Sequence, residues 1–250
     1  MIRVLLCGCN GRMGRAVTAM VEKEEQMQIV AGIDQFTEVA NSYPVFTSIA
    51  ECDVEADVVI DFSSSKVTND LLDSCIKTNT PVVLCSTGHS EEQLAQIREA
   101  SKSVAILKSG NMSVGINVLE KLLKQAVVIL GNEGYDIEIV EKHHNQKLDA
   151  PSGTALDLAN CMNEEVDNKY HYVYDRTTRR EKRDANEIGI SSIRGGSIVG
   201  DHDVIFAGQD EVITFSHSAY SRAIFAKGAV TAAKFLSGKE PGFYTMQDVI

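Results

Sequence analysis

Two histidines and a lysine that could carry protons stand close together past the middle of the chain. His143, His144 and Lys147 follow an apolar, strand-like run at 135–140, and a sharp Pro-Ser-Gly turn comes soon after them at 151–153. Histidine titrates near neutral pH, and a lysine beside other cations loses its proton more easily. The cluster therefore favours a site that gives a proton to its substrate, with ordinary surface groups as the plain alternative.

The turn after this cluster predicts the beginning of a helix. Apolar residues recur at helical spacing from 155 to 162, which places Ser152, Gly153 and Thr154 at the helix N-terminus. Free backbone N–H groups and the helix dipole at that end favour a carboxylate or a phosphate. Zinc is not expected, because adjacent histidines of an extended chain point to opposite faces and no nearby Cys or HExxH pattern completes a ligand set.

A second candidate site lies near the N-terminus. An apolar run at 3–7 is followed by Gly8-Cys9-Asn10-Gly11-Arg12-Met13-Gly14 and then by helical spacing at 16–21. Strand, glycine turn and helix form the context in which a dinucleotide pyrophosphate binds, because glycines allow the backbone to approach it closely. The spacing is GxxGxxG rather than the strict GxGxxG, so an ordinary tight turn is the alternative.

The acidic residue expected of such a site ends the second predicted strand. Asp34 follows the run at 28–33, where a carboxylate can bind the hydroxyls of the adenosine ribose. The alternative is an exposed aspartate at a strand end. Together with the glycine turn, Asp34 predicts a dinucleotide cofactor.

The order of the elements predicts two domains of different kinds. Strands at 57–61, 81–85 and 104–107 alternate with helices at 66–77 and 91–102, which indicates a doubly wound parallel sheet of Rossmann type. Ligands bind beyond the carboxyl ends of such strands, so the loops at 86–88 and 109–112 are placed to line the cofactor. After a long helix at 114–130, β-branched runs at 188–194, 198–207 and 211–216 predict a second, α+β domain with a mixed sheet, and a helix at 219–236 closes the chain.

Composition and charge limit the possible partners. The chain has 250 residues, of which 44% are hydrophobic, and a net charge of −11. The acidic balance argues against nucleic acid, and an anionic ligand must be held by local basic groups. No apolar run approaches the roughly 20 residues of a membrane span. Six cysteines without CxxC spacing and no expected signal peptide predict a cytoplasmic protein with reduced thiols. The charge-rich stretch at 167–187 is expected to be a solvated loop, with a flap or an oligomer contact as alternatives.

The run Glu141-x-His143-His144-x-x-Lys147-x-Asp149-Ala-Pro-Ser-Gly-Thr-Ala resembles the signature of the dihydrodipicolinate reductases. The Gly-Arg-Met-Gly-Arg sequence at 11–15 resembles the same family. The resemblance implies reduction, by NADH or NADPH, of the cyclic imine dicarboxylate made by dihydrodipicolinate synthase, in lysine and diaminopimelate biosynthesis. It also implies a homotetramer, a dinucleotide-binding domain at 1–113 and 223–250, and a substrate-binding and oligomerisation domain at 114–222.

The resemblance assigns roles residue by residue. It implies His143 and Lys147 as catalytic groups, without deciding which of them delivers the proton. Contacts to the substrate carboxylates are implied for His144, Ser152, Gly153 and Thr154. Cofactor contacts are implied for Gly8, Cys9, Asn10, Gly11, Arg12, Met13, Asp34, Cys85, Ser86, Thr87, Ser109, Gly110, Asn111 and Met112.

The chain departs from the family pattern at several of these positions. Cys85, Ser86 and Met112 stand where Gly, Thr and Phe are common, so backbone contacts are expected to survive better than side-chain packing. Gln35 stands where members that use NADPH well often have an arginine, which predicts NADH preference or dual use, although Arg12 could substitute. For Glu141, Asp61 and Arg222, structural and functional roles are equally open.

Two other functions fit part of the pattern. Another nicotinamide-dependent amino-acid or imine dehydrogenase would explain the glycine turn and Asp34, but not the whole run from Glu141. A redox-sensing dinucleotide-binding protein would explain the first domain, but it would need no organised proton donor.

Overall fold

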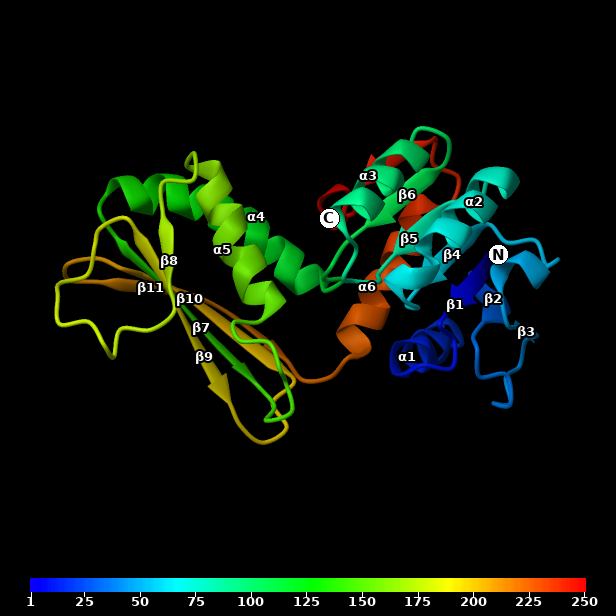
Figure 1. The fold of residues 1–250 in the computed structure, drawn as a ribbon, viewed down its shortest axis with the longest axis horizontal. Coiled ribbons are helices and arrows are strands. Elements are labelled where there is room, and N and C mark those ends of the chain that lie inside the picture. The colour runs from blue at the N-terminus through cyan, green and yellow to red at the C-terminus, as the bar shows by residue number, and fades with distance from the viewer. The chain divides into compact units, whose positions relative to one another are not determined.

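The computed structural model describes all residues, 1–250, and the chain folds into two compact units. Unit 1 comprises Met1–Val114 and Arg222–Ile250, and unit 2 comprises Gly115–Ser221. Figure 1 shows unit 1 built from both ends of the chain, with its blue and red segments together. None of the helices combines the length and apolar character that a membrane crossing requires.

Unit 1 is organised around a sheet of seven strands in the order β12-β6-β5-β4-β1-β2-β3, all paired in parallel. The strands are β1 (Ile2–Cys7), β2 (Met27–Ile33), β3 (Val45–Phe46), β4 (Val58–Asp61), β5 (Val82–Leu84), β6 (Ala105–Lys108) and β12 (Gly242–Tyr244). The helices are α1 (Arg12–Val21), α2 (Thr68–Thr78), α3 (Glu91–Ala100) and α6 (Ala223–Leu236), with short 3-10 turns at Ile49–Glu51, Ser65–Val67 and Met246–Asp248. The Rossmann-type sheet predicted from the alternating strands and helices is confirmed.

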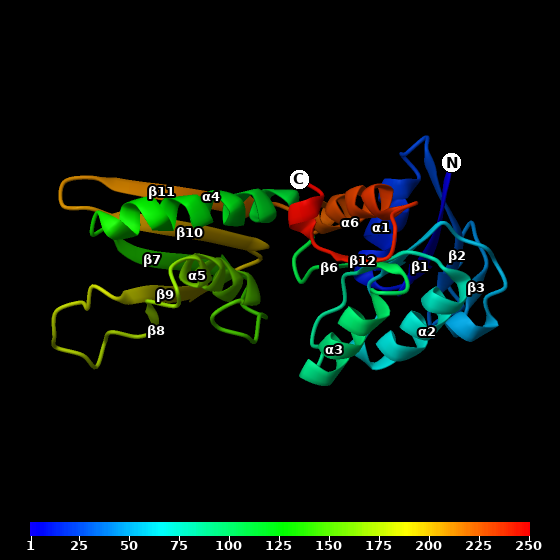
Figure 2. The ribbon, with the colours of Figure 1, turned by 90° about the horizontal axis from the view of Figure 1, so that it is seen from above.

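Helices cover both faces of this sheet, because its strands are apolar on both sides. Side chains of alternate strand residues, such as Leu6 and Ile60, pack with α1 and α6. Their neighbours, such as Leu5 and Val59, pack with α2 and α3 on the other face. Figure 2 shows α1 and α6 on one side of the strands and α2 and α3 on the other. The layers leave the carboxyl ends of the strands as the edge where loops can hold a ligand.

Unit 2 is a mixed sheet of five strands in the order β11-β10-β7-β9-β8, covered on one face by two helices. The strands are β7 (Asp136–His143), β8 (His171–Val173), β9 (Glu187–Arg194), β10 (Gly200–Ala207) and β11 (Val212–Ala219), and the helices are α4 (Val114–Asn132) and α5 (Gly153–Glu165). β7 pairs with β9 in parallel and with β10 antiparallel. The predicted α+β unit with a mixed sheet is confirmed.

Two elements differ from the expectation in ways that affect the site. The predicted strand at 135–140 continues to His143. Hydrogen-bonded pairing with β9 and β10 adds the three polar residues 141–143 to the strand. The helix expected from residue 219 begins at Ala223, because residues up to Ala219 still pair with β10. Both errors have one cause, since the pairing of distant strands determined where each element ends.

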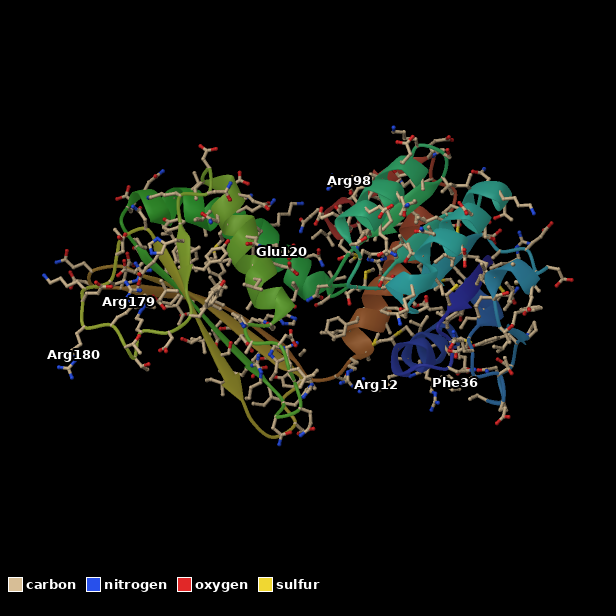
Figure 3. All side chains as sticks on the ribbon, in the orientation of Figure 1. Arg12, Phe36, Arg98, Glu120, Arg179 and Arg180 are labelled. Carbon is tan, nitrogen blue, oxygen red and sulfur yellow. The ribbon has the colours of Figure 1, made fainter.

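The charge-rich loop between β8 and β9 is held by ion pairs rather than simply solvated. Nη2 of Arg176 lies 2.7 Å from Oε1 of Glu187, whose side chain is fully buried. Arg183 pairs with Asp136 at 2.8 Å and with Glu138 at 3.0 Å. Arg180, by contrast, projects outward in Figure 3. The arginines thus tie much of this loop to β7 and to the beginning of β9.

Candidate active site

The alternation of β7 aims two chemically active side chains at the interior of unit 2. Residues of this strand are alternately half-buried and buried, and Glu141 and His143 both lie on the buried side. Lys142 points the other way and forms an ion pair with Asp203 at 2.9 Å. A period of two is the geometry of any strand, so the spacing Glu-x-His is what places the carboxylate and the imidazole together.

The Glu141 carboxylate is the centre of the buried network. Nη1 and Nη2 of Arg194 each donate to one of its oxygens at 2.7 Å, and the backbone N–H of Ser152 donates at 3.1 Å. Burial alone would raise the pKa of Glu141, but hydrogen bonds from Arg194 and His143 outweigh it and lower that pKa to about 2. The carboxylate is therefore ionised at neutral pH although it is fully buried.

This carboxylate fixes the orientation of His143. Nδ1 of His143 lies 2.7 Å from Oε2 of Glu141, so Nδ1 carries the proton that this bond requires and Nε2 remains for other chemistry. The ring is 8% exposed. A β-carbon added to Gly200 would lie 3.0 Å from Nε2, so glycine at that position leaves room for the ring. An imidazole held in this way can exchange a proton at Nε2.

A second histidine packs against the first. The rings of His143 and His202 are 5.2 Å apart in an edge-to-face arrangement. Nε2 of His202 lies 3.0 Å from Oγ of Ser152, which also accepts the N–H of Ala155 at the beginning of α5. Burial, and then the neighbouring His143, lower the pKa of His202 to about 4. His202 is thus neutral at physiological pH, and its uncharged ring packs against the ring of His143.

Lys147 lies in the loop between β7 and α5, bound to a carboxylate of the same loop. Its Nζ is 2.8 Å from Oδ2 of Asp149. The Asp149 carboxylate also accepts a backbone hydrogen bond from Gly153, and these contacts with Lys147 and Gly153 lower its pKa. The Asp149 side chain therefore binds Lys147, the predicted proton donor, and also the helix N-terminus that was predicted to receive a substrate carboxylate.

The predicted substrate contacts are only partly available in this arrangement. Ser152 is 1% exposed and its backbone N–H is bound to Glu141, so the expectation that this N–H is free was wrong. Gly153 is exposed and Thr154 is half-buried. His144 is also half-buried, and its Nδ1 is shielded from solvent with no hydrogen-bond partner.

Two residues of this network were not predicted from the sequence. Arg194 stands beside His143 in the parallel pairing of β7 with β9, and His202 stands opposite Glu141 in the antiparallel pairing with β10. Each comes from a strand more than fifty residues along the chain. Only the register of the sheet brings them in, and no local pattern around either residue signals it.

In unit 1, the glycines of the first turn are needed for its close packing. Gly8 has a φ of +75°, and a β-carbon on it would lie 2.7 Å from the carbonyl oxygen of Phe62. A β-carbon on Gly14 would lie 2.2 Å from the carbonyl oxygen of Gly8. A side chain at Gly8 would push the turn away from the backbone that follows β4, and one at Gly14 would push α1 away from the turn. The turn therefore brings the backbone close to the carboxyl edge of the sheet, as pyrophosphate binding requires.

The beginning of α1 fits an anionic ligand. Its N-cap residue, Gly11, provides no side-chain cap, and the first turn of the helix contains no acidic residue. Asp34 lies at the end of β2, where its Oδ2 accepts the N–H of Asn10 at 2.9 Å. An uncapped helix N-terminus next to a strand-end carboxylate suits a pyrophosphate and a ribose respectively. The residues present thus fit a pyridine nucleotide.

The loops after β5 and β6 are ordered by their own polar contacts. Oγ of Ser86 donates to the fully buried Asp61 at 2.7 Å, and Oγ of Ser109 donates to the carbonyl of Asn111 at 2.8 Å. The side chains of three predicted cofactor residues lie in the core instead, namely Cys9, Cys85 and Met112. Only the backbone of these three residues is placed to contact a cofactor. Asp61 thus has a positioning role, which the sequence left open.

The structure has no group of three or more His, Cys, Asp or Glu side chains arranged to hold a metal ion. The polar clusters of the two units instead consist of hydrogen-bonded pairs and ion pairs.

A Rossmann-type unit with a dinucleotide turn, together with a second α+β unit that holds an ordered proton-carrying cluster, defines the class of pyridine-nucleotide-dependent oxidoreductases. Comparison with known proteins narrows this class. Residues 2–112 match the family model described as dihydrodipicolinate reductase, N-terminus, and residues 115–250 match the one described as dihydrodipicolinate reductase, C-terminus.

Relatives with high identity carry a consistent name. The chain is 52% identical to the 4-hydroxy-tetrahydrodipicolinate reductase of Caldanaerobacter subterraneus subsp. tengcongensis, over 100% of this chain and 98% of that protein. It is 51% identical to the enzyme of the same name from Clostridium novyi, with the same coverage. The fold is that of a dipicolinate-bound dihydrodipicolinate reductase from Paenisporosarcina sp. TG-14, with a TM-score of 0.84 at 24% identity and complete coverage of both chains. The chain belongs to the dihydrodipicolinate reductase family, which confirms the resemblance seen in the sequence.

Proposed function

We propose that this protein is a 4-hydroxy-tetrahydrodipicolinate reductase. It reduces the cyclic imine dicarboxylate formed by dihydrodipicolinate synthase to tetrahydrodipicolinate, in lysine and diaminopimelate biosynthesis. The observation that carries the proposal is the buried pair of Glu141 and His143, followed by Lys147 in the loop between β7 and α5. It occurs in a chain that is 52% identical to a reductase of that name over its full length.

Conversion of the 4-hydroxy substrate to tetrahydrodipicolinate loses the hydroxyl group as water and adds a hydride and a proton, and a bound nicotinamide would supply the hydride. The chain's own groups supply the proton and hold the negative charge. Nε2 of His143 and Nζ of Lys147 are the two proton-carrying atoms, and Glu141 stabilises a protonated His143 through Nδ1. Exposed Gly153, with His144 and Thr154, receives the substrate carboxylates when Asp149 releases the N-terminus of α5. Ser152 acts indirectly, because it caps α5 and contacts His202.

The cofactor is held by the turn at 8–13, by Asp34 and by the backbone of the loops at 85–87 and 109–112. Both oxygens of Asp34 already accept backbone N–H groups, from Asn10 and Phe36. A carboxylate has further lone pairs, so Asp34 can also accept the ribose hydroxyls of NADH. No cation follows Asp34 directly, because Gln35 and Phe36 occupy those positions. We therefore infer NADH preference or dual use, with Arg12 as the cation available to a 2′-phosphate.

The unit boundaries at Val114 and Arg222 suit one cofactor-binding domain and one domain for substrate and assembly. The uncovered face of the unit 2 sheet includes exposed Val212, Thr214 and Ser216 of β11, and a homotetramer formed through unit 2 would cover such a face. Six free cysteines suit a cytoplasmic location.

A coupled assay tests the function. Purified protein is mixed with NADH or NADPH and with dihydrodipicolinate synthase, pyruvate and aspartate semialdehyde, and the nicotinamide absorbance is followed. We expect oxidation that depends on the synthase. Oxidation that is absent with both cofactors, from folded protein that binds NADH, would instead favour another imine substrate or a sensor.

A further inference from the structure

Asn10 stands where the strict GxGxxG fingerprint has its second glycine, and its side chain holds the loop that follows β2. Its Nδ2 donates to the carbonyl oxygen of Phe36 at 2.5 Å, and its Oδ1 accepts from Nδ2 of Asn41 at 3.0 Å. Asn10 is only 7% exposed. The departure from glycine therefore has a structural consequence, because it joins the loop at 35–41 to the turn that binds the pyrophosphate.

Both backbone groups of Phe36, its N–H and its carbonyl, form hydrogen bonds, whereas its side chain is exposed to solvent. Its N–H donates to Oδ1 of Asp34 at 3.0 Å, and its carbonyl is the one that Asn10 holds. The residue is 75% exposed, which makes it one of the most exposed large apolar residues in the chain. Figure 3 shows Phe36 and Arg12 along the same edge of unit 1.

We propose that the side chain of Phe36 is the platform on which the adenine ring of the dinucleotide stacks. The inference rests on the cofactor of the proposed function and deepens it. Adenine is bonded to the ribose that Asp34 binds, so it must lie within reach of the side chains next to Asp34. An aromatic face stacks on any base, and burial of an exposed phenyl ring adds to the gain. The hydrogen bonds from Asn10 and to Asp34 hold the backbone of Phe36 in place before the ligand arrives, which reduces the ordering cost of binding.

The alternative is that Phe36 is an exposed loop residue without a partner. The two possibilities differ in which part of the cofactor responds to its removal. A stacking residue affects NADH and ADP-ribose, which contain adenine, and leaves reduced nicotinamide mononucleotide unaffected. A residue that merely supports the turn at 8–14 would affect all three ligands, because the turn holds phosphate.

The test uses the full-length protein and three variants. Phe36→Ala removes the ring, Phe36→Tyr keeps an aromatic face, and Phe243→Ala removes the same group from the strand at the opposite edge of the sheet, where it is 43% exposed. Affinities for NADH, ADP-ribose and reduced nicotinamide mononucleotide are measured by calorimetry, and the thermal midpoint of each variant is recorded.

We expect Phe36→Ala to weaken NADH and ADP-ribose binding roughly five- to hundredfold, as the loss of one base stack implies. Reduced mononucleotide affinity should be unchanged, Phe36→Tyr should restore tight binding, and Phe243→Ala should behave as the parent. Unchanged ADP-ribose affinity in Phe36→Ala, or an equal loss for the mononucleotide, overturns the assignment while the proposed function stands. A parent protein that binds neither NADH nor ADP-ribose overturns both.

Discussion

Nδ1 of His143 lies 2.7 Å from Oε2 of Glu141, two residues earlier on the same strand. The carboxylate is held in turn by two hydrogen bonds from Arg194, so the imidazole is oriented by a group that itself cannot rotate. Arg194, Glu141 and His143 form a chain of charge and hydrogen bonds that ends at the free Nε2. This relationship leads to the first prediction.

Glu141→Gln should lower kcat while leaving NADH affinity unchanged. The amide cannot stabilise a protonated His143, and it leaves the Arg194 guanidinium without its carboxylate. Removing one partner of a buried ion pair costs about 3 kcal/mol or more of unfolding free energy. Steady-state kinetics and urea unfolding measure both effects. Glu138→Gln on the half-buried side of the same strand is the control for kcat, and equal kcat losses in the two variants would contradict the orienting role.

Stability should fall as the pH drops from about 6.5 towards 4, and His202 should be a cause. The folded state lowers the pKa of His202 from 6.5 to about 4, so in this window the unfolded chain binds more protons than the folded one. The corresponding loss is about 3 kcal/mol, complete below pH 4. Unfolding free energies of the parent and of His202→Gln, measured across this range, should converge towards acid pH. A constant difference between them would exclude His202 as the source.

Glu141 should contribute a second, more acidic loss of stability. Its folded-state pKa of about 2 is below its usual 4.5, so its contribution is present above pH 4.5 and is lost as the pH falls towards 2. Acid unfolding followed by circular dichroism should therefore begin at higher pH in Arg194→Met, where the carboxylate has lost its main partner. The same midpoint in both proteins would show that this pair does not determine acid stability.

Lys147→Met should reduce kcat by about a hundredfold or more, the usual range for loss of a general acid. The fold should be unaffected, since Lys147 forms its ion pair with the largely exposed Asp149. Lys142→Met is the matched control, because it removes the same charge from the other side of β7, where the lysine pairs with Asp203. A Lys147→Met protein with near-normal kcat would leave His143 as the proton donor.

Asp149→Asn should lower the KM for the imine substrate severalfold. The Asp149 carboxylate is bound to Lys147 and to the N–H of Gly153, where a substrate carboxylate would compete with it. The ion pair is solvent-exposed on the aspartate side, so its loss should change unfolding free energy by less than about 1 kcal/mol. Initial rates over a range of substrate concentrations measure KM, and an increased KM would show that Asp149 assists substrate binding.

Gln35→Arg should shift cofactor use towards NADPH. The guanidinium would stand directly after Asp34, where it can pair with the 2′-phosphate in two hydrogen bonds. The ratio of kcat/KM for NADPH to that for NADH should rise at least tenfold, and Gln35→Met serves as a neutral control. A parent protein that already strongly prefers NADPH would contradict the interpretation of Gln35.

Much of unit 1 could be predicted from the sequence, because residues that are close together in the chain determine its strands and its first turn. Apolar runs define buried strands, and the glycines of the first turn are required by close backbone contacts within a few residues, as at Gly8 and Gly14. The position of Asp34 could be predicted because it is the residue that comes directly after the apolar run of its strand. The run from Glu141 to Ala155 likewise indicated the family, because its residues are contiguous.

The tertiary structure alone decided how the proton-carrying cluster is built. Arg194 and His202 join Glu141 and His143 because β9 and β10 pair with β7 in one particular register, and a shift of one residue would turn them to the other face. The same pairing extended β7 as far as His143. Ser152 became a buried residue for the same reason, since it packs against this strand. Local sequence determines which residues can form a strand, whereas strand pairing over fifty residues or more determines which side chains meet.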